Sequence, residues 1–140
     1  NSFFKSKVIK DSKVNFDEQL TNYGGSDQLF FKLLSKKKYI IKWNSNSLVY
    51  ENYQVNREKN KWFFKRNLRY GYSGNIIDLK CYGKFLGIFI IFLKVIFLII
   101  QSIIVICIPF HSYRLKSFFC AVRALGRILG IFNYNPKKYI

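Results

Sequence analysis

The chain has 140 residues, enough for one domain of ordinary size, and 24 Lys and Arg residues against 7 Asp and Glu residues give it a net charge of +17. Such an excess of bases indicates an anionic partner: nucleic acid, a phosphate-bearing substrate or an anionic membrane surface. Because half of the residues are hydrophobic and many stand in one block, a membrane is favoured over nucleic acid. Three scattered cysteines and a single histidine exclude a four-ligand zinc site, so we expect the cysteines to be small apolar thiols in a reducing compartment.

Composition divides the chain into three regions: residues 1–80 are mixed, 81–110 are almost continuously apolar, and 111–140 are basic and amphipathic. The chain has no Met and begins at Asn1, so we expect a fragment whose N-terminal part is missing.

In the first region, the pattern predicts a helix over 27–35 whose buried stripe is Leu29, Phe30, Leu33 and Leu34. It then predicts a strand at 38–43, a turn at 44–47 and a second strand at 48–51. A further helix is predicted from Arg57 to about Lys80, interrupted at 71–74. This order of elements is typical of the later part of an α/β domain.

The apolar block runs from Phe85 to Ile108 and is interrupted at its centre by Lys94. As a helix it would be about 36 Å long, against a hydrocarbon core of roughly 30 Å. A central Lys costs about 2.5–3.5 kcal/mol on the insertion scale, which the surrounding Ile, Leu, Phe and Val residues outweigh. We therefore predict a membrane-inserted segment.

The polar interruptions of this block share one helix face, because Lys84, Gly87, Lys94 and Gln101 recur at spacings of three and seven. The first interpretation is a stripe that packs against another helix or against the protein's own domain. The second is a contact to an anionic lipid-linked substrate.

Residues 115–132 form an amphipathic pattern, with Lys116, Arg123 and Arg127 on one face and Phe119, Val122, Leu125 and Leu129 on the other. This is typical of a helix that lies in the membrane interface. The Gly126–Gly130 spacing is, by itself, weak evidence for helix association. The dense upstream bases place that side in the cytoplasm, but the basic downstream flank leaves a re-entrant or interfacial arrangement open.

Asp27 stands behind two glycines at the start of the predicted helix. Either Ser26 or Asp27 suits the N-cap position, where a side-chain oxygen accepts hydrogen bonds from the first turn. The helix dipole also favours the ionised carboxylate, and an ionised carboxylate can accept a proton. Capping therefore does not exclude a catalytic role.

Several spaced motifs across residues 1–80 together resemble the C-terminal half of family 2 glycosyltransferases, of the kind that builds bacterial exopolysaccharides and lipopolysaccharide cores. The matching residues are Phe16-Asp17-Glu18, Gly24-Gly25-Ser26-Asp27, Val49-Tyr50-Glu51, Arg57, Trp62, Arg66, Arg69 and Gly71. Ser26 departs from the family's more frequent Glu, and the processive enzymes' Q-x-x-R-W motif is absent from the sequence.

The resemblance implies the C-terminal half of a GT-A, Rossmann-like α/β domain over 1–80, then a transmembrane or re-entrant segment over 81–110 and an interfacial tail over 111–140. It implies inverting transfer of a sugar from a nucleotide-sugar donor to a saccharide or lipid-linked acceptor, at the cytoplasmic face of the plasma membrane. Asp27 would be the base that removes the acceptor hydroxyl's proton. Arg66 and Arg69 would contact diphosphate or acceptor, and Tyr50 and Glu51 would line the acceptor side.

The same resemblance implies a divalent metal, Mg²⁺ or Mn²⁺, held mainly by a D-x-D motif upstream of this chain. We expect residues 1–140 alone to be inactive for that reason. Two other hypotheses stay open: a non-enzymatic membrane anchor or interaction protein, and a nucleic-acid binder that uses the basic and aromatic side chains of 61–72. Of the three hypotheses, we favour the membrane-associated enzyme, and we expect no nucleic acid among its partners.

Overall fold

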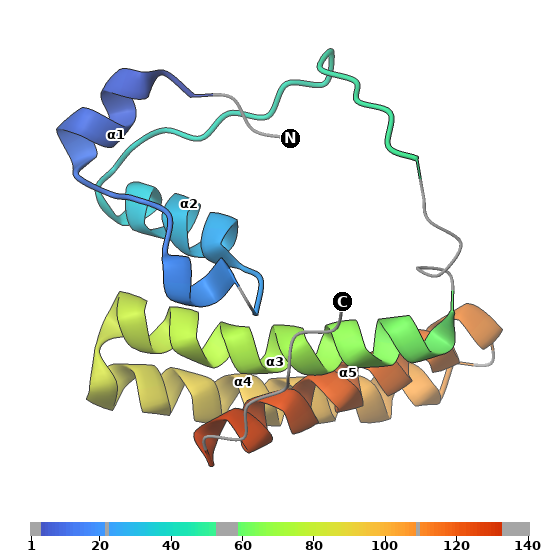
Figure 1. Cartoon of the computed structure of the whole chain (residues 1–140). Coiled ribbons are helices and arrows are strands. Elements are labelled where there is room, and N and C mark those ends of the chain that lie inside the picture. The colour runs from blue at the N-terminus through green and yellow to red at the C-terminus, as the bar shows by residue number, and fades with distance from the viewer. Residues whose placement is uncertain (1–3, 22, 53–58, 109, 133–140) are drawn as a thin grey trace.

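The computed structural model describes residues 4–21, 23–52, 59–108 and 110–132. Helix α1 (Ser6–Ser12), a 3₁₀ turn η1 (Glu18–Thr21) and helix α2 (Ser26–Lys36) form an N-terminal unit. Helices α3 (Asn60–Tyr82), α4 (Lys84–Ile106) and α5 (His111–Ile131) form an antiparallel bundle. Figure 1 shows the N-terminal unit on one side of α3 and α4 on the other.

The expected α/β fold is wrong, because the described residues contain helices and no strand. Residues 39–52 form an extended segment that runs apart from the bundle (Figure 1). The predicted turn does form, since Ser47 N donates to Asn44 O at 3.4 Å. The strands on either side do not pair, and Ile40 and Tyr50 stay 83% and 94% exposed. The residues have strand propensity, but a strand is stabilised by packing against neighbouring strands. The described residues provide no such neighbour.

The prediction for α2 is confirmed. Leu29, Phe30 and Leu34 are buried on one face, and Leu33 is partly buried beside them. Leu29 packs with η1 and with Ile77 and Cys81 of α3. The other part of the stripe packs under α1, where the rings of Phe30 and Phe16 stack with centroids 4.3 Å apart. The N-terminal unit is therefore fixed to the bundle through α3.

The predicted interruption of α3 at 71–74 is wrong, because the helix continues through both glycines; Arg57 lies outside the described residues. Gly71 instead lets α5 approach closely. A Cβ built on it would lie 2.3 Å from the carbonyl oxygen of Arg123. A Cβ built on Gly126, across the same contact, would lie 2.1 Å from the carbonyl oxygen of Leu68. The Gly126–Gly130 pair thus packs two helices of one chain, as small residues do at close helix crossings.

The predicted basic and apolar faces of α5 are not divided between water and membrane as expected. Arg127 is buried and Arg123 is partly buried against α3, while Lys116 is exposed. On the predicted apolar face, Val122 is buried and Leu125 is exposed. The helix packs through parts of both faces, because α3 supplies polar partners for the two arginines.

We expect Gly71→Ala and Gly126→Ala each to lower the free energy of unfolding by roughly 2–3 kcal/mol, because backbone atoms must move apart to admit the methyl group. This loss would exceed the gain of about 1 kcal/mol in helix propensity. Gly74→Ala is the comparison: its nearest neighbour is the guanidinium of Arg127 rather than backbone, so a side chain must shift and the loss should be smaller than for the other two variants. Chemical denaturation in detergent would measure all three, and equal stability of all three variants would contradict the close crossing.

Candidate functional site

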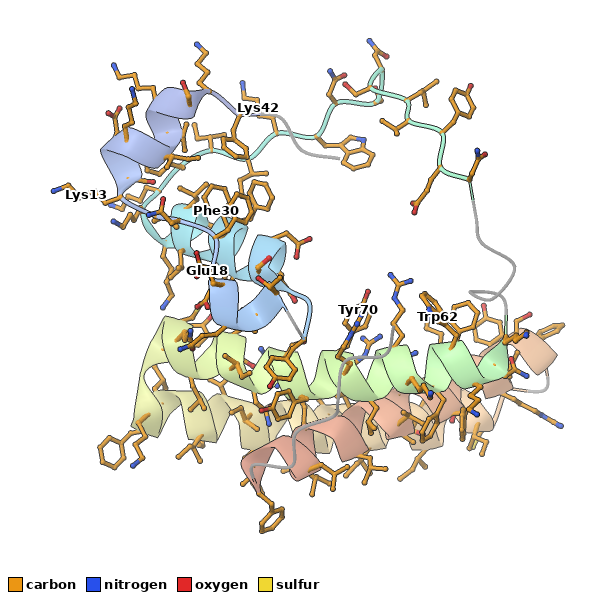
Figure 2. All side chains as sticks on the ribbon, in the orientation of Figure 1. Lys13, Glu18, Phe30, Lys42, Trp62 and Tyr70 are labelled. Atoms are coloured by element: carbon orange, nitrogen blue, oxygen red, sulfur yellow. The ribbon has the colours of Figure 1, made fainter. Side chains whose placement is uncertain are left out.

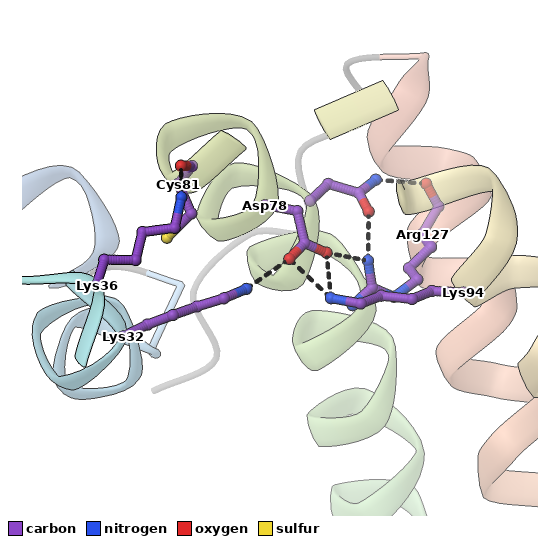
Figure 3. Close-up of polar contacts among 7 residues, drawn as sticks. Lys32, Lys36, Asp78, Cys81, Lys94 and Arg127 are labelled. Carbon is purple, nitrogen blue, oxygen red and sulfur yellow. Dashed lines mark hydrogen bonds and ion pairs between the residues drawn. The ribbon is translucent and has the colours of Figure 1, made fainter. Parts of the chain in front are cut away.

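A single carboxylate lies where the N-terminal unit and the bundle meet. Asp78 of α3 is 1% exposed and accepts hydrogen bonds from Lys32 of α2 at 2.8 Å, from Lys94 of α4 at 2.7 Å and from Arg127 of α5 at 3.0 Å (Figure 3). We call these four residues the Asp78 cluster. Three positive charges surround one negative charge, and each cation comes from a different helix.

Arg127 is fixed in this cluster by a reciprocal pair of hydrogen bonds with Asn75. Its Nη1 donates to Asn75 Oδ1 at 3.1 Å, and Asn75 Nδ2 donates to the Arg127 carbonyl at 2.7 Å. Gly74 and Gly130 make room for the two side chains, since a Cβ at either position would lie 2.7 Å from one of their nitrogens. The arginine is thus held to α3 by its side chain and by its backbone.

The electrostatics of the cluster favour the ionised acid. Burial alone would raise the pKa of Asp78, but the hydrogen bonds and charges of Lys32, Lys94 and Arg127 outweigh it and hold the pKa below its usual value. Burial would likewise lower the pKa of Lys32, yet its contact with Asp78 leaves that pKa raised. A lowered carboxyl pKa contributes stability that is present above the unfolded-state value of 3.8 and is lost as the pH falls through the folded-state value.

Helix α4 packs on α3 and α5 along a narrow stripe. Gly87 lies against Leu79, Lys94 reaches Asp78, and Gln101 Oε1 accepts a hydrogen bond from Cys120 Sγ at 3.6 Å. The first interpretation of this polar stripe, packing against the protein's own helices, is confirmed at these three positions. Lys84, which the pattern grouped with them, is exposed at the start of the helix.

The remainder of α4 is an apolar surface that nothing in the described chain covers. Among the described residues, α4 is the one helix long and apolar enough to cross a membrane. Figure 1 shows α4 on the side of α3 opposite the N-terminal unit. We call its thirteen exposed hydrophobic residues the bare face of α4: Phe85, Leu86, Ile88, Phe89, Phe92, Leu93, Ile96, Phe97, Ile99, Ile100, Ile103, Ile104 and Ile106.

The opposite side of α3 carries basic and aromatic residues. The guanidinium of Arg66 lies 4.6 Å from the ring centroid of Trp62, and its Nε donates to the hydroxyl of Tyr70 at 2.7 Å. Figure 2 shows Trp62 and Tyr70 on the side of α3 that faces the N-terminal unit. Arg69 lies beside Gly24 of the loop before α2, and its Nε is buried without a hydrogen-bond partner among the described residues.

The residues predicted for sugar transfer lie on three separate elements. Asp27 is exposed in the first turn of α2, Tyr50 and Glu51 are exposed on the extended segment, and Arg66 and Arg69 are on α3. The predicted side-chain cap is wrong, because Gly25 occupies the N-cap position and no side chain donates or accepts there. In the part of the chain that the structure describes, no three His, Cys, Asp or Glu side chains gather as a metal site would need.

Asp78 was missed by the sequence analysis, although one signal pointed to it. It is the last acid of the chain, and 24 bases compete for seven acids, so a lone acid within a helical pattern is a natural partner for the single Lys of the apolar block. Which bases reach it depends on how the helices cross, and periodicity alone does not give that.

We expect Asp78→Asn to lower the free energy of unfolding by about 3 kcal/mol at neutral pH, because it leaves three cations close together without their anion. Asp27→Asn is the matched control. It also removes one acid, but from an exposed position, and should cost less than about 0.5 kcal/mol. As the pH falls below 4, wild-type stability should decline more steeply than that of Asp78→Asn. Denaturation curves in detergent measure both effects, and parallel pH profiles would contradict the charge assignment.

We compared the chain with protein-family models, with curated proteins and with solved structures, and none of them matches it. The resemblance to glycosyltransferases therefore rests on its motifs alone.

Proposed function

We propose that this chain is a membrane-binding module whose bundle lies in the plane of the interface, with the bare face of α4 immersed among lipid chains. The observation that carries the proposal is the position of that face: it lies on the opposite side of α3 from the polar N-terminal unit. The molecule is thus amphipathic as a whole, along a direction perpendicular to its helices. That geometry suits a surface between water and hydrocarbon.

An upright, crossing α4 is less favourable for the same reason. Helices α3 and α5 pack along α4, so an upright bundle would bring both into the hydrocarbon with Arg66, Arg69 and Lys116. Each such charge costs about 2.5–3.5 kcal/mol at the bilayer centre. The polar N-terminal unit, which is fixed to α3, would be drawn toward the same depth. A bundle that lies flat keeps these groups above the hydrocarbon.

The bare face supplies enough free energy for stable attachment. Covering an apolar side chain is worth about 1.5–3 kcal/mol when it is complete, and the thirteen side chains are between 39% and 92% exposed. Even partial immersion of half of them exceeds 5 kcal/mol. Exposed bases at the ends of the bundle, including Lys84, Arg114 and Lys116, lie where anionic head groups would meet them.

A bilayer fits this face better than a protein partner does. The face is apolar along the whole length of α4, about 35 Å at 1.5 Å per residue, and carries no polar side chain that would fix the register of a partner helix. Two copies of the chain could also associate through the bare face of α4. Dimerisation would then compete with vesicle binding, and the test below distinguishes the two outcomes.

The sugar-transfer hypothesis stays a prediction. It is not the function that the geometry favours, because the described residues lack the α/β sheet on which that chemistry was expected. Nucleic-acid binding would use the basic and aromatic side of α3. That hypothesis does not explain the bare face of α4.

We expect Ile103→Asp, in the bare face at 61% exposure, to weaken binding to phosphatidylcholine vesicles by at least tenfold, because a carboxylate resists entry into hydrocarbon. Leu48→Asp on the extended segment, at 77% exposure, is the matched control and should bind like wild type. Vesicle flotation measures both. Equal binding by the two variants would contradict immersion of α4. A chain that ignores vesicles but sediments as a dimer only when Ile103 is intact would show a protein partner instead.

A further inference from the structure

A pocket opens among the three bundle helices near the connection from α4 to α5. It is open to solvent rather than enclosed, and its volume is about 400 Å³. Its polar lining comes from all three helices: Asn67 of α3, Gln101 of α4, and Ser112, Lys116 and Arg123 of α5. Phe119 is part of its apolar wall.

The pocket is lined by hydrogen-bond donors that the protein leaves partly unused. Arg123 Nη2 donates to Asn67 Oδ1 at 2.8 Å, and Asn67 Nδ2 donates to the Phe63 carbonyl at 2.9 Å, so the asparagine fixes the arginine in place. The Nε of Arg123 is buried and has no hydrogen-bond partner among the described residues, as is also true of Arg69 and Arg127. A ligand in the pocket would therefore meet Arg123 through its outer guanidinium nitrogens.

The remaining lining adds donors and a second positive charge. Because Gln101 Oε1 already accepts from Cys120 Sγ, the amide nitrogen Nε2 is the group with hydrogen-bonding capacity to spare. Lys116 is exposed at the pocket, Ser112 adds a hydroxyl, and the lining contains no acid. No acid follows Asp78 anywhere in the sequence. Two cations and two neutral donors without a carboxylate match a dianion that has several oxygens.

We propose that this pocket binds a phosphomonoester group, supplied by the head group of an anionic lipid. Its lining includes Leu115 and Phe119 of α5, so an acyl chain leaving the pocket would meet apolar side chains. This inference rests on the proposed membrane binding and adds head-group selectivity to it. The Asp78 cluster is not part of the site, because its cations are already paired with a carboxylate.

The test uses the full chain and two kinds of vesicle, phosphatidylcholine mixed with phosphatidic acid or with phosphatidylserine and matched in surface charge. Wild type should bind phosphatidic acid vesicles about tenfold more tightly, since hydrogen bonds between charged groups carry that much selectivity. Lys116→Gln should bring the ratio of the two affinities close to one. Arg123→Lys should do the same, because it keeps the charge but loses the planar fork.

Arg114→Gln is the matched control, since it removes one exposed base from α5 two residues away from Lys116. It should weaken binding to both vesicles by up to about fivefold and leave their ratio unchanged. A wild-type ratio near one would overturn the proposal, even if both vesicles are bound and the membrane module itself stands. A ratio that falls equally in Lys116→Gln and Arg114→Gln would also overturn it, because diffuse attraction would then explain the selectivity.

Inorganic phosphate tests whether the selectivity comes from this pocket. Because phosphate offers the same oxygens as the lipid head group, it should lower the wild-type ratio toward one relative to a chloride control of equal ionic strength. A wild-type ratio that phosphate leaves unchanged would overturn the pocket as a phosphomonoester site. Phosphate that binds the chain without vesicles, together with a wild-type vesicle ratio near one, would assign the pocket to free phosphate and overturn the lipid source.

Discussion

Asp78 of α3 connects α2, α4 and α5, because its buried carboxylate accepts hydrogen bonds from one cation of each of these helices. Without it, Lys32, Lys94 and Arg127 would repel one another at the point where α2, α4 and α5 converge on α3. Such a site is weak evidence for net stability, since burying the charges is itself costly. Its consequence is specificity: other arrangements of these helices would leave a cation buried without an anion.

The Asp78 cluster also explains how the apolar helix α4 accommodates the Lys at its centre. Lys94 directs its charge toward Asp78, and Gln101 and Ser102 pair with α5, so the polar groups of α4 other than the exposed Lys84 face inward. The outward face is left almost entirely hydrocarbon. Helix α5 is mixed: Arg127 is buried and Phe118 is exposed, but Lys116 is also exposed and Val122 is buried. A helix such as α4, which turns its polar groups inward and its apolar groups outward, is suited to lipid rather than to water.

Side-chain periodicity predicted the elements whose packing depends on residues close in sequence. The buried stripe of α2, the apolar block of α4 and its inward polar stripe all follow from side chains three, four or seven residues apart. The rest depended on contacts between distant segments. Ile40 and its neighbours suit a strand, but no other described segment pairs with them as a strand. Gly71 suggests a helix break from sequence alone, whereas its role is to let α5 approach closely. Arg123 and Arg127 of α5 turn inward because Asn67, Asn75 and Asp78 of α3 supply their partners, and no spacing within α5 reveals those partners.

The proposed membrane-binding function requires a bundle that lies flat in the membrane. The depth of α4 in the bilayer tests this directly. Nitroxide side chains would be placed in turn at positions 85–106 of the vesicle-bound chain, in a background without the native cysteines, and their accessibility to oxygen and to a nickel complex measured. A flat bundle predicts a depth that oscillates with a period of about 3.6 residues around a constant mean. A depth that rises steadily to one maximum near residue 95 and then falls would show a crossing helix and contradict the account.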